Sequence, residues 1–261
     1  MNYGLNLLVI NNLNDIDENN VKNYYRYNEI DFYYKKYDNS DRLIVSFHGA
    51  IPGIVIQQLP VFRSYNWKYN VLCISDKLLE LYPDLHLAWY LSPKSSNIHN
   101  TYVEIIQRFL QIYTNVIFHG CSGGGFPSFL YSSLFHKKMF VQNSQFYLEK
   151  YSLHFTKMLQ ILKLNILSDF NELTGEQIIT NYGCPSKAII YCNKNDKIHY
   201  ESHFLPLYNF IIDNNLNTNN TFVFFSFIGD EPVTPKTHHH VQLPNTKSIH
   251  EIINELFMCD N

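Results

Sequence analysis

Residues 115–125 read Asn-Val-Ile-Phe-His-Gly-Cys-Ser-Gly-Gly-Gly, and this stretch decides the fold. Its apolar beginning, residues 116–118, predicts a short buried strand, and residues 126–135 beyond the glycines read as a helix. Between strand and helix, residues 120–124 fit the pattern Gly-x-Ser-x-Gly. A serine in such a place sits in a strained turn, so that its hydroxyl stands above the end of the sheet. Ser122 is therefore the candidate nucleophile, and a plain glycine-rich turn is the alternative.

Nucleophilic attack on an acyl carbon creates an oxyanion, for which fixed hydrogen-bond donors must be in place. The N–H of Gly123, the residue after the candidate nucleophile, is the first expected donor. The second is expected in the loop after an early strand, and His48-Gly49-Ala50 follows the apolar run at residues 42–47. Ala50 or Gly49 is the expected donor of this loop, unless the loop merely turns the chain.

In this type of site the acid and then the histidine follow the serine along the chain. Asp196 comes in the loop after an apolar run at residues 187–192. That is the expected place for the acid that holds the imidazole in one tautomer and stabilises its cation. A solvated aspartate beside Lys194 and Lys197 is the alternative interpretation.

Three adjacent histidines stand between the last expected strand and the closing helix. The general base is expected there, with His240 as the first choice and His239 and then His238 as alternates. His238 and His240 could also share a metal ion, but no matching cluster of cysteines, histidines or carboxylates accompanies them, so no metal site is predicted. Two further histidines near the site, His119 and His199, are interpreted as structural.

Strands and helices alternate along most of the chain. Apolar runs predict strands at residues 42–47, 69–74, 85–91, 115–118, 138–141, 187–192 and 221–227. Three-to-four spacing predicts a helix at residues 101–113, and residues 126–135, 203–214 and 248–258 also read as helices. This alternation predicts a mainly parallel central sheet flanked by helices. With the Ser122 turn it predicts a single α/β-hydrolase domain over residues 1–261. The mostly helical stretch at residues 146–182 is the predicted cap or lid.

Composition narrows the range of partners. A formal net charge of −3 and only 16% charged residues give no reason to expect a nucleic acid. No run of 18 apolar residues occurs, so no membrane span is expected. The five cysteines are scattered without a Cys-x-x-Cys pair, which indicates reduced thiols and a cytoplasmic protein. A homo-oligomer is left open.

A second string carries a resemblance to a known family. Residues 140–151 read Phe-Val-Gln-Asn-Ser-Gln-Phe-Tyr-Leu-Glu-Lys-Tyr. With Asn143-x-Gln145 and Tyr151, this string resembles the segment after the serine helix in α/β-hydrolase-fold capsular polysaccharide proteins, which include the capsule O-acetyltransferases. The elements of residues 42–258 fall in the matching order. The chain departs where those relatives tend to have glycine before a single histidine, because Thr237 and three histidines stand here.

The resemblance implies acetyl transfer from acetyl-CoA to a hydroxyl of a bacterial polysaccharide, without a bound cofactor. In ping-pong order, Ser122 would be deprotonated by His240, take the acetyl group and pass it to the sugar. Trp89 is a candidate for contact with a sugar ring, and ordinary packing is the alternative. Arg63 is a candidate for holding a phosphate or an acidic sugar, and a plain surface arginine is the alternative.

Two rival functions stay open. A serine esterase or thioesterase, with water as the acceptor, shares the fold and the triad. A non-catalytic homologue that binds a glycan or a partner protein is the third hypothesis. The joint presence of Ser122, Asp196 and a late histidine argues against it, since a binding protein has no need of all three.

Overall fold

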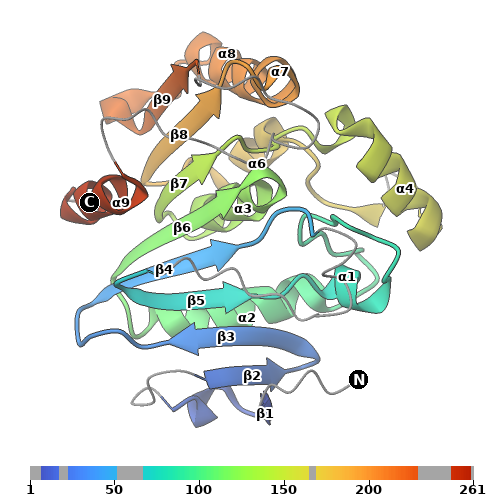
Figure 1. Cartoon of the computed structure of the whole chain (residues 1–261), viewed down its shortest axis with the longest axis vertical. Helices are drawn as coiled ribbons and strands as arrows, with labels where there is room; N and C mark the ends of the chain where they lie inside the picture. The colour runs from blue at the N-terminus through green and yellow to red at the C-terminus, as the bar shows by residue number, and fades with distance from the viewer. Residues whose placement is uncertain (1–6, 18–22, 52–66, 165–168, 229–247, 260–261) are drawn as a thin grey trace.

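The computed structural model describes residues 7–17, 23–51, 67–164, 169–228 and 248–259 (Figure 1). In these residues nine strands form one sheet in the order β1-β2-β3-β5-β4-β6-β7-β8-β9. The strand pairs from β5 through β4 to β9 are all parallel, and β3 runs antiparallel to β2 and β5. The predicted mainly parallel sheet is confirmed. The strands are β1 (Leu7–Val9), β2 (Asn23–Tyr27), β3 (Ile30–Lys35), β4 (Arg42–Phe47), β5 (Asn70–Ile74), β6 (Asn115–Cys121), β7 (Lys138–Gln142), β8 (Lys187–Asn193) and β9 (Phe222–Phe227).

Helices connect the successive strands from β5 to β9 and cover the sheet (Figure 1). Their bounds are α1 (Lys77–Leu81), α2 (Ile98–Leu110), α3 (Gly125–Leu134), α4 (Ser152–Leu162), α6 (Gly175–Tyr182), α7 (Lys197–His199), α8 (Leu205–Asp213) and α9 (Ile249–Met258). Five single turns complete the described elements: η1 (Leu13–Asp15), η3 (Ser122–Gly124), η4 (Leu148–Lys150), the π-helical turn η5 (Tyr200–Phe204) and η6 (Thr218–Asn220).

Both faces of the central strands are buried, as their apolar sequences require. Side chains alternate along β4, so Leu43 and Val45 belong to the core on the face of α2 and α3, whereas Ile44 points to the other face. On that second face Ile44 and Ile117 share a cluster with four side chains of α9, namely Ile252, Ile253, Leu256 and Phe257. The central strand β6 is thus covered on both faces, and Ser122 follows directly at its carboxyl end.

The strand predicted at residues 85–91 is wrong. Trp89 and Tyr90 have φ angles of 54° and 57°, in the left-handed region that a strand excludes. The backbone N–H groups of this segment form no strand-like hydrogen bonds in these two places. The N–H of Leu91 donates to the carbonyl of Ala88, and the N–H of Tyr90 donates to Oδ2 of Asp76 at 2.9 Å. This segment is a buried loop, and its apolar content alone made it resemble a buried strand.

Candidate active site

Ser122 lies at the carboxyl end of β6, where the chain enters η3 and then α3. Its φ of 54° is left-handed, a conformation that costs a non-glycine residue about 1 to 3 kcal/mol. Glycines permit this turn, because a Cβ on Gly120 would overlap the carbonyl of Gly124 and a Cβ on Gly124 would overlap the carbonyl of Phe47. The strand, the strained serine and the helix predicted from the sequence are all present, and Ser122 is 6% exposed.

The imidazole nearest to this serine in the described residues is that of His199. Its Nε2 lies 3.5 Å from Oγ of Ser122, and its Nδ1 lies 2.7 Å from Oδ2 of Asp196. The distance between Nδ1 of His199 and Asp196 is that of a strong contact, but the N–H direction does not meet the geometry of a hydrogen bond. All three groups are buried. Serine, imidazole and carboxylate are thus in series, and catalytic contacts of this kind are often loose before substrate binds.

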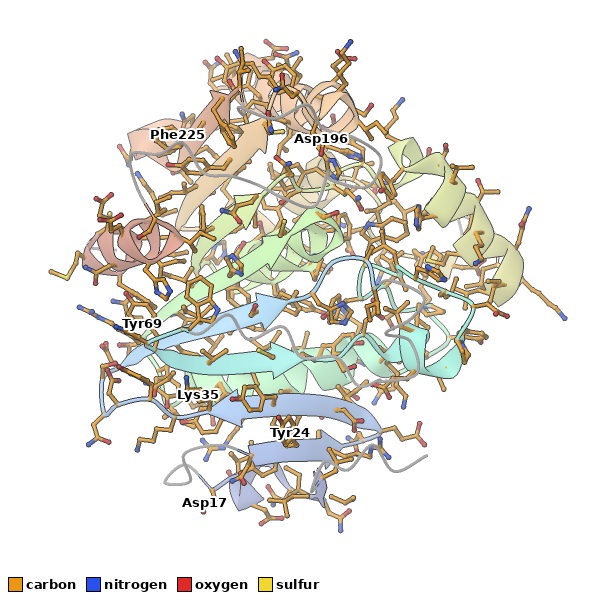
Figure 2. All side chains as sticks on the ribbon, viewed as in Figure 1. Asp17, Tyr24, Lys35, Tyr69, Asp196 and Phe225 are labelled. Carbon is orange, nitrogen blue, oxygen red and sulfur yellow. The ribbon has the colours of Figure 1, made fainter. Side chains whose placement is uncertain are left out.

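Asp196 is held at the start of α7, just beyond the carboxyl end of β8 (Figure 2). Its side chain caps the helix by accepting from the N–H of His199 at 3.4 Å. Asn143 follows β7 and donates from Nδ2 to Oδ2 of Asp196 at 3.4 Å, while its own Oδ1 accepts from the N–H of Asn193 at 2.8 Å. The acid predicted from the sequence is therefore fixed from two neighbouring strand ends.

Gln145 joins the serine to the imidazole. Its Nε2 lies 3.3 Å from Oγ of Ser122 and 3.3 Å from Nε2 of His199, and its backbone N–H donates to the carbonyl of Ser122 at 3.2 Å. On the other side of the amide, Oε1 accepts from Nε1 of Trp89 at 2.6 Å. Gln145 is fully buried, so these contacts are made without competition from water.

The predicted oxyanion loop lies directly against the serine turn. A Cβ on Gly49 would lie 3.4 Å from Cβ of Ser122 and 3.5 Å from the backbone nitrogen of Gly123. Nδ1 of His48 lies 2.8 Å from the carbonyl oxygen of Gly49. Because the peptide group is planar and trans, this contact also fixes the N–H of Ala50, which points the opposite way. The arrangement suits the predicted roles of Gly123, Gly49 and Ala50, which remain a prediction.

Gly49→Ala tests these roles. The added methyl would stand 2.8 Å from the carbonyl oxygen of Cys121, too close for either group to keep its place, and 3.5 Å from the backbone nitrogen of Gly123. Because one oxyanion donor is typically worth about a hundredfold in rate, we expect fluorophosphonate labelling of Ser122 to slow by about that factor. Gly175→Ala, where the new methyl meets only side-chain atoms at 3.0 Å and beyond, is the matched control. Unchanged labelling of a folded Gly49→Ala protein would remove this loop from the mechanism.

Several predicted residues lie outside the described residues. These are the three candidate bases His238, His239 and His240, and the candidate substrate residue Arg63. Trp89 is described and is 1% exposed, with Tyr151 and Phe155 packed edge-on to its ring. It therefore reaches the site through the hydrogen bond of its indole N–H to Gln145. The proposed contact of Trp89 with a sugar ring stays a prediction.

The predicted cap at residues 146–182 contributes to the surroundings of the site. Tyr151, just before α4, places its ring 5.9 Å from that of His199. Phe155, in the first turn of α4, packs on Trp89. The later helix α6 packs against α3. The beginning of α4 is thus the part of this stretch that could exclude water from Ser122, and its action as a lid remains a prediction.

A second buried histidine, His203, lies on the π-helical turn η5 next to this group. Its Nδ1 accepts from the N–H of Tyr147 at 3.2 Å, and its ring lies 5.8 Å from that of His199. Burial, and then the nearby His199, lower the pKa of His203 to about 3. The unfolded chain therefore takes up a proton near pH 6.5 that the folded chain refuses until about pH 3. The stability that neutral His203 provides is complete above pH 6.5 and is lost as the pH falls toward 3.

His203→Asn keeps an acceptor for Tyr147 but cannot titrate. Between pH 6 and pH 4 we expect the free energy of unfolding of the unaltered protein to fall more steeply than that of the variant, by up to about 1.4 kcal/mol per pH unit. Urea unfolding at pH 6, 5 and 4 measures the two slopes. Equal slopes would mean that His203 titrates normally in the folded protein.

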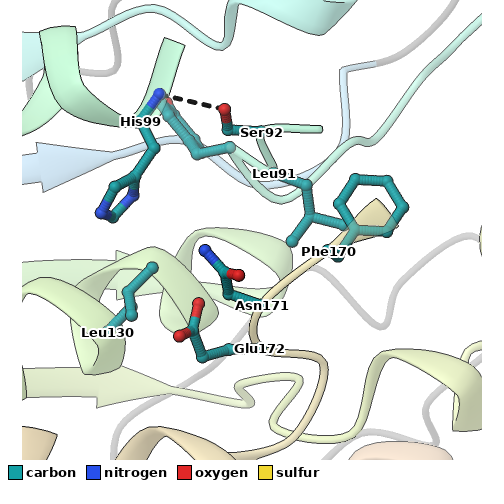
Figure 3. A pocket seen from close by; sticks show the side chains of 8 residues that line it. Leu91, Ser92, His99, Leu130, Phe170, Asn171 and Glu172 are labelled. Atoms are coloured by element: carbon teal, nitrogen blue, oxygen red, sulfur yellow. Dashed lines mark hydrogen bonds between the residues drawn. The ribbon is translucent and has the colours of Figure 1, made fainter. Parts of the chain in front are cut away.

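A small cavity is lined in part by Tyr90 and Leu91, the two residues after Trp89 (Figure 3). Its volume is about 20 Å³, which suits a single water molecule rather than a substrate. The residues that line it are Tyr90, Leu91, Ser92, His99, Leu130, Phe170, Asn171 and Glu172. Ser122 is not among them, so this cavity is separate from the candidate active site.

From the sequence alone His199 is interpreted as structural, whereas the structure places its ring beside Ser122. Asp196 and His199 stand three residues apart at the start of a helix, a spacing that puts two side chains on one face. This spacing is the signal for His199 in the sequence, because Asp196 is the predicted acid. The role of Gln145 had no such signal, since an amide in a loop after a strand is common.

No known protein-family model matches the chain, and no curated protein sequence matches it. Solved structures do. The capsule O-acetyltransferase of Neisseria meningitidis serogroup A is 18% identical with a TM-score of 0.55, covering 83% of this chain and 90% of that one. A histidine-to-alanine mutant of that enzyme in complex with CoA is 16% identical with a TM-score of 0.50, and the match covers 95% of this chain and 97% of that one. The fluorophosphonate-binding serine hydrolase F of Staphylococcus aureus is 10% identical with a TM-score of 0.54, covering 80% and 90%.

At these identities the likeness concerns the fold. The chain has the α/β-hydrolase fold that the sequence predicted, with its mainly parallel sheet flanked by helices. The solved structures that it resembles include an acetyltransferase, a serine hydrolase and a carboxylesterase. In the part of the chain that the structure describes, the helices are too short or too polar to cross a membrane.

Proposed function

We propose that this protein is an enzyme that transfers an acyl group by way of a covalent intermediate on Ser122. The observation that carries the proposal is the series of contacts from Oγ of Ser122 to Nε2 of His199 at 3.5 Å and from Nδ1 of His199 to Asp196 at 2.7 Å. A strained serine, an imidazole and a buried carboxylate in this order have the chemistry of a nucleophile with its general base.

In the first half of the proposed reaction, Oγ of Ser122 forms a bond to the acyl carbon of a thioester, and its proton passes to Nε2 of His199. The oxyanion that results is stabilised by backbone N–H groups, for which Gly123 and the loop of Gly49 and Ala50 are the candidates. The carbon–sulfur bond then breaks, and the thiolate leaves with the proton from His199. Asp196 stabilises the imidazolium while it exists.

In the second half, a hydroxyl group of the acceptor attacks the acyl-serine and gives its proton to the same imidazole. The new ester forms as the bond to Oγ breaks, and the proton returns to Ser122. A transferase must keep water away from the acyl-serine, and Ser122 is only 6% exposed. We propose acetyl-CoA as the donor and a bacterial capsular or surface polysaccharide as the acceptor. A capsule O-acetyltransferase and a CoA complex of its mutant are among the similar structures, which supports this choice.

Incubation with acetyl-CoA labelled in the acetyl group, with and without purified bacterial capsular glycans, tests the proposal. The expected result is an acetylated Ser122 peptide in the absence of glycan and label transferred to glycan in its presence. A serine esterase or thioesterase is the second candidate, supported by the similarity to a fluorophosphonate-binding serine hydrolase. Release of free acetate at the same rate with or without glycan would favour that candidate.

A further inference from the structure

The side chain of Gln145 has only one orientation compatible with its neighbours. The indole N–H of Trp89 can donate but cannot accept, so the amide atom that faces it at 2.6 Å must be the oxygen. The NH₂ group therefore faces Oγ of Ser122 and Nε2 of His199, each at 3.3 Å. An amide nitrogen can only donate, and it has two hydrogens for these two acceptors.

This orientation determines where the proton of His199 resides. Nε2 must carry a lone pair if it accepts from Gln145, so in the neutral ring the proton is on Nδ1, 2.7 Å from the carboxylate of Asp196. That is the tautomer in which Nε2 can take a proton from Ser122. Likewise, a serine oxygen that accepts from Gln145 keeps its own O–H free to point at Nε2 of His199, 3.5 Å away, whose single lone pair the amide and the hydroxyl then share.

Trp89 makes this contact from a strained turn. Trp89 and Tyr90 are two successive left-handed residues, and such conformations persist only where the surroundings impose them. Tyr90 is fixed by its N–H bond to Asp76 at 2.9 Å and by its hydroxyl, which donates to the carbonyl of Ile74 at 2.8 Å. The turn therefore presents the indole N–H of Trp89 to Gln145 rigidly.

We propose that Gln145 is the positioning residue of the active site, and that Trp89 holds its amide in the orientation that keeps His199 ready to act as a base. This inference rests on the proposed function, since it assigns a role beside a nucleophilic Ser122. It also gives the string Asn143-x-Gln145 a chemical role: Asn143 holds Asp196, and Gln145 holds Ser122 and His199.

Two substitutions of Gln145 separate this role from simple packing. Gln145→Glu can still accept from Trp89, but its second oxygen would favour a proton on Nε2 of His199 and stabilise the imidazolium. We expect it to slow fluorophosphonate labelling at pH 7 by about a hundredfold and to move the acid limb of the rate–pH profile upward by about one unit or more. Gln145→Met, similar in size but unable to donate, is expected to slow labelling about tenfold without this upward shift.

The role of Trp89 is tested by a double-mutant cycle. Trp89→Phe removes the indole N–H and is expected to slow labelling about fivefold to tenfold. In the Gln145→Met background the same change should have no further effect, because the amide that Trp89 orients is gone. Phe155→Leu is the control, since Phe155 packs on the same indole ring at 6.1 Å, and we expect its labelling rate to stay within about twofold.

The labelling rates decide whether Gln145 and Trp89 have the proposed roles, and thermal unfolding verifies that the variants are folded. Folded Gln145 variants that label at the normal rate, or a Glu variant that slows without a pH shift, would overturn the inference while leaving the proposed function intact. Additive effects of Trp89→Phe and Gln145→Met would overturn the role of Trp89. An unaltered protein that never labels at Ser122 would contradict the proposed function, and the inference with it.

Discussion

Ser122→Ala is expected to abolish covalent labelling by a fluorophosphonate and to lower acetyl transfer from acetyl-CoA by about a thousandfold or more. Removal of a serine nucleophile leaves only the rate that oxyanion donors and substrate binding provide, and comparable changes in serine enzymes reach about a millionfold. The hydroxyl is small and the turn is set by the glycines around it, so the fold should persist. Mass spectrometry of the labelled protein and a radiolabelled acetyl assay measure the two effects.

Ser144→Ala is a suitable control for this experiment. Ser144 is also buried, and it lies so close to the serine helix that a Cβ on Gly125 would overlap its side chain. Its hydroxyl has no hydrogen-bond partner among the described residues. The same loss of one oxygen at Ser144 is therefore expected to leave labelling unchanged. Labelling that persists in Ser122→Ala would show that another residue is the nucleophile.

His199→Ala is expected to slow labelling about a thousandfold, because Ser122 would lose the imidazole that takes its proton. Added imidazole should restore part of the rate by entering the space that the side chain leaves, and it should not do so for Ser122→Ala. The measurement is the labelling rate against imidazole concentration above pH 7, where free imidazole is mostly neutral.

The same assay decides between His199 and the histidines predicted from the sequence. His238→Ala, His239→Ala and His240→Ala, tested one at a time, are expected to label at close to the normal rate if His199 is the base. If His199→Ala keeps more than a tenth of the rate and one of the three shows the large loss, the base is that histidine. Chain order allows both solutions, since all four histidines follow Asp196.

Short sequence patterns were enough to predict the strands, the turn and the helix that carry Ser122 and Asp196. An apolar run, a glycine-framed serine and a helical period predicted the end of β6, η3 and α3, because each of these signals is short in range. The place of Asp196 after β8 follows from a general property of parallel sheets, whose carboxyl ends gather on one edge. The turn at Trp89 could not be read in this way, because its left-handed residues depend on the distant carboxylate of Asp76.

The sequence by itself determined the class of fold, the serine turn and the strand end that carries the acid, since these depend on residues adjacent in the chain. Only the tertiary structure decided that His199 faces Ser122 and that Gln145 stands between them with its amide held by Trp89. Those contacts join segments 23 to 77 residues apart in the chain. They exist because β6, β7 and β8 end side by side, and because glycines let the segment of Gln145 approach the serine helix closely.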